Sequence, residues 1–146
     1  MSVKVIVRGL ARALTALCFI LALAASATAE EVIDRFLSDV VVGKDGTLDV
    51  VEDITVEAEG IQIKRGILRD FPTDYQNADG TRVRVTFDVS SVERNGNPVK
   101  WATERIGNGV RLRIGDPDRL LQPGFHTYRI AYRTAGQVGF FDGYDQ

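Results

Sequence analysis

The chain has 146 residues, of which 45% are hydrophobic and 26% are charged, with one histidine and one cysteine. This length suits a single domain with one core, and a single cysteine excludes a disulfide framework or a cysteine-rich metal site. The net charge of −2 gives no electrostatic basis for binding nucleic acid, so we expect no nucleic-acid partner.

The first 29 residues predict a cleaved signal peptide. Lys4, Arg8 and Arg12 form a positive segment, and residues 13–29 are uncharged. Ala27 and Ala29 place small side chains at the −3 and −1 positions of a signal-peptidase site. The alternative is a membrane anchor, but the uncharged run would span only about 26 Å as a helix, less than a hydrocarbon core of about 30 Å. We therefore expect residues 1–29 to be removed and residues 30–146 to form the exported domain.

The residues after the signal segment predict β-strands. Residues 47–58 alternate apolar and polar side chains, which is typical of a half-buried strand. The turn residues Gly43–Gly46 join this segment to residues 32–42, so the two should form a hairpin. Further strands are predicted over residues 81–93, 99–103, 110–114 and 125–134.

No segment after residue 30 has sustained helical periodicity. The strand spacing predicts an all-β fold, an antiparallel immunoglobulin-like β-sandwich of about seven to eight strands. A small closed barrel is the alternative. Without a disulfide between the sheets, Trp101 and the Phe and Tyr residues should fill the centre.

The sequence offers little catalytic chemistry. No Gly-x-Ser-x-Gly motif exposes a serine, and His126 alternates with Tyr128 and Ile130 as a strand residue. Two loops carry acids that could bind calcium, Asp116 with Asp118 and Asp142 with Asp145, but both lack the spacing of a calcium loop. We expect no catalytic residue, metal or cofactor. A carboxylate-dependent hydrolase, which would need two facing carboxylates flanked by aromatic side chains, is the remaining enzymatic alternative.

Glu52 is the residue that breaks the pattern. It falls on the apolar face of its strand, between Val50 and Ile54, where an unpaired charge is expensive. Arg69 is the first candidate for its partner, and Arg65 is the second. We interpret the pair as an internal ion pair that fixes strand register, with a binding or switch element as the alternative.

Three motifs in order resemble one known family. They are DGTLDVVE at residues 45–52, RGILRDFP at residues 65–72 and VGFFDGYD at residues 138–145. Together they resemble the N-terminal extracytoplasmic domain of the predicted bacterial membrane proteins known as domain of unknown function family 2207. The resemblance covers about residues 31–146. It implies a β-sandwich outside the cytoplasm and transmembrane helices further along the protein, but no established activity.

We therefore expect a non-enzymatic sensing, binding or interaction domain on the outer face of the cytoplasmic membrane. A secreted module that binds a glycan or a protein is the alternative. The expected partners are the membrane, through a segment beyond Gln146, and an unidentified protein. We also expect the domain to be truncated before its last strand, which would leave residues 138–146 poorly packed.

Overall fold

The computed structural model describes residues 31–76, 80–138, 140–141 and 144–145. The predicted signal peptide, with Ala27 and Ala29, lies outside the described residues. Every regular element in the described part is a strand, and seven strands have six or more residues. These are β1 (Ile33–Val42), β2 (Leu48–Ala58), β3 (Gly66–Pro72), β6 (Thr86–Arg94), β8 (Trp101–Ile106), β9 (Gly109–Gly115) and β10 (Gly124–Ala135).

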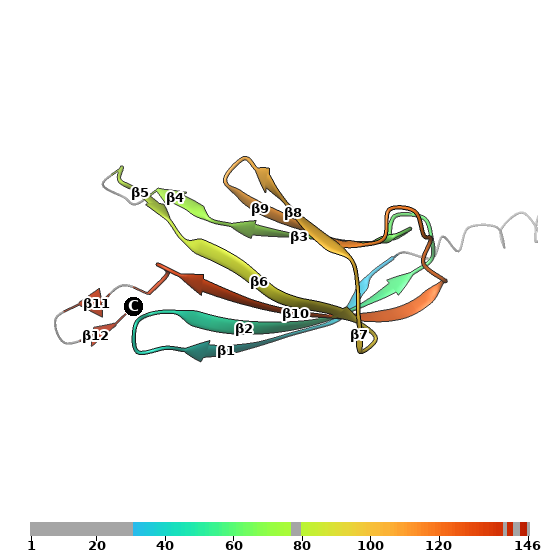
Figure 1. Cartoon of the computed structure of the whole chain (residues 1–146), viewed down its shortest axis with the longest axis horizontal. Coiled ribbons are helices and arrows are strands. Elements are labelled where there is room, and N and C mark those ends of the chain that lie inside the picture. The colour runs from blue at the N-terminus through green and yellow to red at the C-terminus, as the bar shows by residue number, and fades with distance from the viewer. Residues whose placement is uncertain (1–30, 77–79, 139, 142–143, 146) are drawn as a thin grey trace, which may run out of the picture. The chain divides into compact units, whose positions relative to one another are not determined.

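The long strands form two antiparallel sheets that lie face to face (Figure 1). The main sheet has the order β1-β2-β10-β6-β7, where β7 is the short strand Asn97–Pro98, and the second sheet has the order β3-β9-β8. Two small ladders pair β4 (Asp74–Gln76) with β5 (Arg82–Arg84), and β11 (Phe140–Phe141) with β12 (Tyr144–Asp145). The predicted all-β antiparallel sandwich is confirmed, and the described strands do not close into a barrel.

The predicted hairpin joins β1 to β2. The Gly43 N–H donates to the Thr47 carbonyl at 2.7 Å, and Gly46 has a positive φ of 77°, which glycine adopts without strain. The Asp45 carboxylate accepts hydrogen bonds from the backbone N–H and the hydroxyl of Thr47. The turn therefore sets a register in which Val42 lies opposite Leu48 and Val40 opposite Val50.

The core lies between the inner faces of the two sheets. In β2 the even positions from Val50 to Ala58 are buried and the odd positions are partly exposed, as the alternation predicts. The central buried cluster draws on five strands: Ile54, Val56, Phe71, Val92, Leu112, Ile114, Tyr128 and Ile130. Burial of these side chains supplies the main favourable free energy of folding.

Two sequence predictions need correction. The strand expected over residues 81–93 is split: β5 pairs with β4, and β6 joins the main sheet. A bulge then changes the register, because Ala131 lies opposite Ser91 while Tyr132 lies opposite Val89. The extra residue, Ser90, switches which side chains face inward, so Val92 is buried, whereas an unbroken alternation would have placed Val89 and Val92 on opposite faces.

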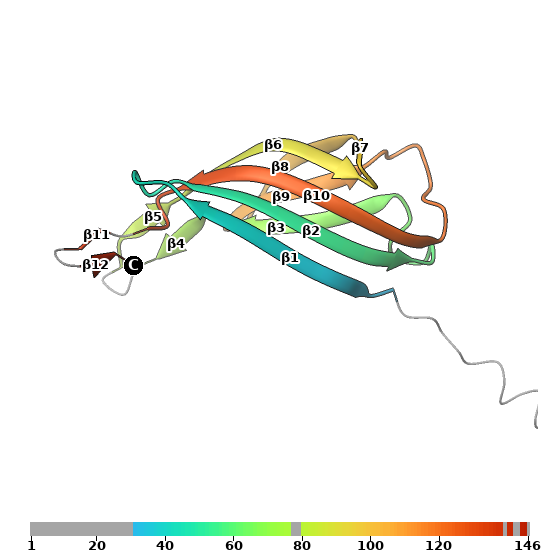
Figure 2. The ribbon, with the colours of Figure 1, turned by 90° about the horizontal axis from the view of Figure 1, so that it is seen from below.

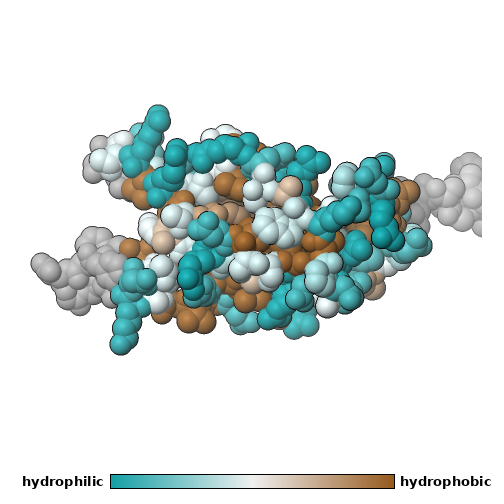
Figure 3. Space-filling view, in the orientation of Figure 1, coloured by the Kyte–Doolittle hydropathy of each residue, from teal (hydrophilic) through white to brown (hydrophobic). Residues whose placement is uncertain are grey.

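Trp101 does not fill the centre of the sandwich. It begins β8, an edge strand of the second sheet, and its side chain is 40% exposed. In the orientation of Figure 1, hydrophobic residues form a band between the two sheets, with hydrophilic residues on both sides of it (Figure 3). The centre is filled instead by Tyr128, Leu112 and Ile130, which are the largest fully buried side chains.

The strand β3 was not predicted as a strand. It pairs with β9 along its whole length, from Gly66 opposite Gly115 to Pro72 opposite Gly109. At the first of these pairs the backbones lie so close that a Cβ on Gly66 would be 1.7 Å from the Ile114 carbonyl oxygen. The path of β3 brings Arg69 over the inner face of β2.

Candidate functional site

Glu52 and Arg69 lie together between the sheets. The Glu52 carboxylate is only 3% exposed, and it accepts hydrogen bonds from Arg69 Nε and Nη2, both at 2.9 Å. The Tyr132 hydroxyl donates a third hydrogen bond to Glu52 Oε1 at 3.0 Å. This two-pronged geometry is the strong form of an arginine–carboxylate interaction, so both oxygens of the buried charge are satisfied.

The two partners of Glu52, Arg69 and Tyr132, both have pKa values far above neutral pH. The hydrogen bond to Glu52 raises the pKa of Arg69 above its ordinary value. Burial, together with the negative charge of Glu52, raises the pKa of the Tyr132 hydroxyl above its ordinary value of 10.0. Tyr132 therefore remains a neutral donor and Arg69 a cation at physiological pH. A general acid or base needs a pKa near the working pH, so these two groups suit a structural role.

Aromatic rings surround the ion pair. The Arg69 guanidinium lies 4.6 Å from the centre of the Phe71 ring and 5.7 Å from that of Phe36. Phe71 stacks on Phe87 at 4.1 Å, and both rings lie 5.0 Å from Tyr132. The cluster links β1, β3, β6 and β10 around the ion pair, in which the Glu52 carboxylate is buried and the Arg69 side chain is 33% exposed.

A groove runs between β1 and β3. It has a volume of about 450 Å³, and mostly apolar side chains line it. The lining residues are Ile33, Phe36, Ile54, Val56, Gln62, Ile63, Gly66, Ile67, Leu68 and Arg69. The groove exists because the second sheet ends at β3, whereas the main sheet continues to β1.

All ten residues of β1 are exposed, although six are large and apolar. Figure 2 shows β1 at the edge of the main sheet. Phe36 and Val40 lie opposite the buried residues Ile54 and Val50, so they belong to the inner face, yet they are 47% and 50% exposed. We call Ile33–Val42 the β1 edge. Such an edge presents unpaired backbone donors and acceptors beside apolar side chains, which is what an added strand needs.

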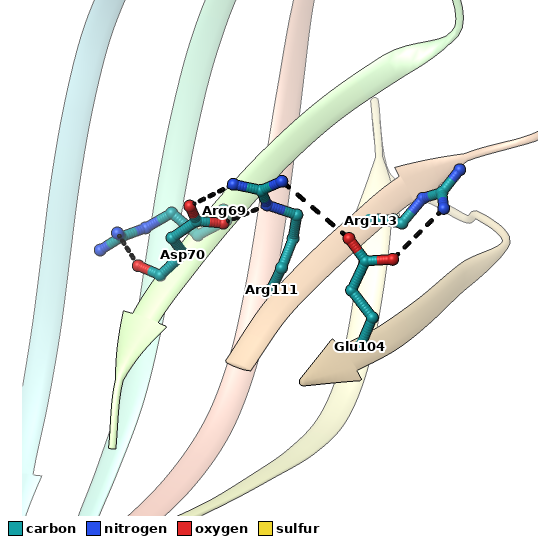
Figure 4. Close-up of polar contacts among 5 residues, drawn as sticks. All are labelled: Arg69, Asp70, Glu104, Arg111 and Arg113. Carbon is teal, nitrogen blue, oxygen red and sulfur yellow. Dashed lines mark hydrogen bonds and ion pairs between the residues drawn. The ribbon is translucent and has the colours of Figure 1, made fainter. Parts of the chain in front are cut away.

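The outer faces of both sheets differ from the β1 edge, because cross-strand ion pairs cover them. On the second sheet, Asp70 binds Arg111 through both carboxylate oxygens at 2.6 and 2.7 Å, and Glu104 lies between Arg111 and Arg113 (Figure 4). On the main sheet, Asp49 pairs with Arg133 and Asp53 with Arg129. Such charged faces favour contact with water.

Several side chains of the types that serve in catalysis or metal binding have structural partners. His126 Nε2 lies 2.8 Å from the Gln122 carbonyl oxygen, and the Ser90 hydroxyl donates to the Ala131 carbonyl. Asp116 pairs with Lys100 and accepts the N–H of Asp118, which makes an ordinary turn. In the part of the chain that the structure describes, no three His, Cys, Asp or Glu side chains are grouped as a metal site requires. Asp142 lies outside that part.

Glu31 holds the loop after β2 in place, a contact that the sequence analysis did not predict. Its carboxylate accepts four backbone N–H groups of the loop after β2, those of Glu59, Ile61, Gln62 and Ile63. Desolvation opposes the charge, but the four hydrogen bonds together hold the pKa of this carboxyl below its usual value. No local pattern identifies such a contact, because the loop lies about thirty residues away in sequence.

Among known proteins, the chain is 32% identical over 105 residues to the "Uncharacterized protein YciQ" of Escherichia coli (strain K12). The match covers 72% of this chain and 17% of that protein, so the chain spans only a small part of its relative. No solved structure matches the chain. None of the described residues belongs to a helix that could cross a bilayer. Residues 32–146 match the family model "Predicted membrane protein (DUF2207) N-terminal domain", and the chain therefore belongs to this family of predicted membrane proteins.

Proposed function

We propose that this domain is a non-enzymatic interaction module outside the cytoplasm, and that it binds another polypeptide through the β1 edge. The observation that carries the proposal is the exposure of a complete ten-residue edge strand with six large apolar side chains. Exposed contiguous apolar surface on a domain marks an interaction site. Strand addition at a sheet edge is a common way for proteins to bind an extended segment.

The location outside the cytoplasm is supported by the predicted signal peptide and by membership of a family of predicted membrane proteins. A signal sequence directs the residues that follow it across the membrane. The domain is then positioned to bind a partner on the outer face, while the rest of the protein holds it at the membrane.

A binding role is favoured over a hydrolytic one by the state of the carboxylates. A glycosidase requires a carboxylic acid whose pKa is raised, so that it can donate a proton. Hydrogen bonds from arginine instead hold the pKa of Asp49, Asp70 and Asp74 below the ordinary value of 3.8. Glu52 is engaged by Arg69 and Tyr132. Each of these four carboxylates accepts hydrogen bonds from an arginine and so serves the fold.

Site-specific photo-crosslinking in cells tests the proposal. A photo-reactive amino acid is placed at Val41 in the protein expressed from its own gene. Leu120 is the matched control, because both residues are 67% exposed but Leu120 lies in the loop before β10 and not on β1. We expect a discrete polypeptide adduct from Val41 that is absent from Leu120.

The adduct should also depend on the edge itself. Leu37→Lys adds a charge on the same strand and should abolish the Val41 adduct, since a lysine on an edge opposes strand addition. Equal labelling at Val41 and Leu120, or an adduct that persists with Leu37→Lys, would contradict the proposal.

A further inference from the structure

We infer that the polypeptide bound at the β1 edge is a second copy of this chain. In the inferred dimer, the two β1 strands pair antiparallel about a twofold axis at Leu37, and two main sheets become one continuous sheet. The inference rests on the proposed function, because it names the occupant of the same edge.

The two edges of the main sheet are unequal. The far edge is made by β7, a strand of two residues that contains Pro98, and by the part of β6 that β7 does not cover, where the bulge at Ser90 breaks the regular strand. Short strands and proline are devices that prevent pairing at an edge. The β1 edge has ten residues, no proline and no lysine. The β1 edge is therefore the longer and more regular of the two, and because a twofold β1–β1 contact uses the same edge of both copies, it gives a closed dimer instead of a fibre.

The charges on β1 select the register. Arg35 and Asp39 lie two residues on either side of Leu37, and both face outward, opposite Thr55 and Val51 of β2. Neither side chain has an ion pair or hydrogen bond within the described residues. A twofold axis perpendicular to the sheet keeps the outer faces of the two copies on the same side. Residues that lie opposite each other must then both be odd-numbered or both be even-numbered, so the axis lies at a residue that is opposite its own copy. An axis at Leu37 places Arg35 of each copy opposite Asp39 of the other, and both pairs form.

Other axes lose this complementarity. An axis at Asp39 places the two Asp39 carboxylates opposite each other, where like charges are destabilising. An axis at Phe36 places Arg35 opposite Leu37 and leaves Asp39 without a cation. Arg35 and Asp39 are therefore complementary to each other in one register only, while Asp34, the third charged residue of β1, lies in the bulge between Ile33 and Arg35.

The inner face supports the same register. With the axis at Leu37, Phe36 of one copy lies opposite Ser38 of the other. A small side chain beside a large ring leaves space for the ring to cover the apolar groove at β1 and β3. The exposed Phe36 side chain, which already contacts Arg69, would then be buried on its open side.

Pairing along one strand buries less surface than the roughly 1,600 Å² of a standard interface. We therefore expect a weak dimer in dilute solution and a well-populated one where attachment to a membrane raises the local concentration. The test must accordingly be made on the protein in its membrane.

Cysteine trapping provides the test, since residues 30–146 contain no cysteine. Leu37→Cys places two thiols opposite each other at the axis, at the Cβ spacing of cross-strand pairs. Under mild copper–phenanthroline oxidation in membranes, we expect a disulfide-linked dimer about tenfold faster than from Leu120→Cys or Val41→Cys, which do not lie opposite themselves. Equal rates at the three positions would overturn the inference.

Charge reversal tests the register. In the Leu37→Cys background, Arg35→Asp or Asp39→Arg alone creates two like-charge pairs and should lower the trapping yield about tenfold. The double change Arg35→Asp with Asp39→Arg reverses both pairs and should restore the yield to within about threefold. These residues have no partner in the fold, so folding should be unchanged by circular dichroism. Failure of the double change to restore trapping would overturn the register.

The two proposals can fail separately. If Val41 crosslinks in cells to a different protein while Leu37→Cys forms no dimer, the edge binds a partner but not a second copy. If neither experiment gives an adduct at β1, both proposals are wrong.

Discussion

At the scale of single residues, the buried ion pair is the most sensitive point. Glu52→Gln removes the charge that balances Arg69 and should destabilise the domain by about 2–3 kcal/mol. This is below the ~3–5 kcal/mol of a fully buried pair, because the Arg69 side chain is 33% exposed. Changing both residues to leucine should cost less than the sum of the single changes. Urea unfolding measures each free energy.

The control for this prediction is the partly exposed pair of Asp53 and Arg129, which joins β2 to β10 on the outer face. Asp53→Asn should change stability by less than about 1 kcal/mol. Equal losses from Glu52→Gln and Asp53→Asn would mean that burial gives the inner pair no special weight.

We predict that the domain loses stability at alkaline pH, because the pKa of the Tyr132 hydroxyl is raised in the folded state. The contribution of this hydroxyl is complete below the ordinary value of 10.0 and is lost as the pH rises above that value. Tyr132→Phe should cost about 1–2 kcal/mol at pH 7 and flatten the decline between pH 9 and 11. Thermal unfolding across this range, with Tyr75→Phe as control, checks the slope; parallel curves would contradict the assignment.

The sequence predicts half of this site. The parity of the alternation places Glu52 on the inner face, and the buried charge then requires a cation. Tyr132 could not be identified as the second partner of Glu52, because nothing local indicates that β10 pairs with β2. The Phe36 contact was missed for a similar reason: it depends on how far β3 reaches over the main sheet.

At the scale of elements, the pairing of β3 with β9 depends on glycine. Gly66 and Gly115 have φ values of 148° and 136°, and neither backbone leaves room for a Cβ. Gly66→Ala should therefore separate the strands at this end and cost at least ~1–3 kcal/mol in backbone strain alone. Gly107→Ala is the control, since no atom lies within 4 Å of a Cβ there. Similar melting temperatures for the two variants would contradict the close approach.

The predictions for strands failed where packing overrides local pattern. In β3 the inward positions are Ile67, Arg69 and Phe71. The arginine interrupts the apolar alternation, so the sequence pattern does not predict a strand there. Trp101 has the composition of a core residue, but its strand lies at an edge, where the facing sheet does not cover it. Burial at such positions depends on the order of strands in the sheet, and the alternation within a single strand gives no information about that order.

At the scale of the whole molecule, we predict that export removes residues 1–29. The first described residue, Glu31, is already bound by the loop after β2, so the fold begins two residues after the expected cut. The intact mass of protein recovered from the periplasm should correspond to a chain that starts at Glu30. Ala29→Phe should retain the leader, because signal peptidase requires a small residue there. Exported protein that keeps residues 1–29 would contradict the prediction.

The position of β10 between β2 and β6 affects how the chain is made. The roughly 80 residues from the end of β2 to the end of β10 take about 4–15 s to synthesise at ~5–20 residues per second. A hairpin such as β1–β2 closes in about 1–10 μs. On a ribosome, β2 therefore waits several seconds with its inner edge unpaired, and β6 waits with it. The main sheet cannot assemble until β10 has emerged, because β10 is the last long strand in the sequence but lies between β2 and β6 in the sheet. The nascent chain therefore needs protection from other chains throughout that interval.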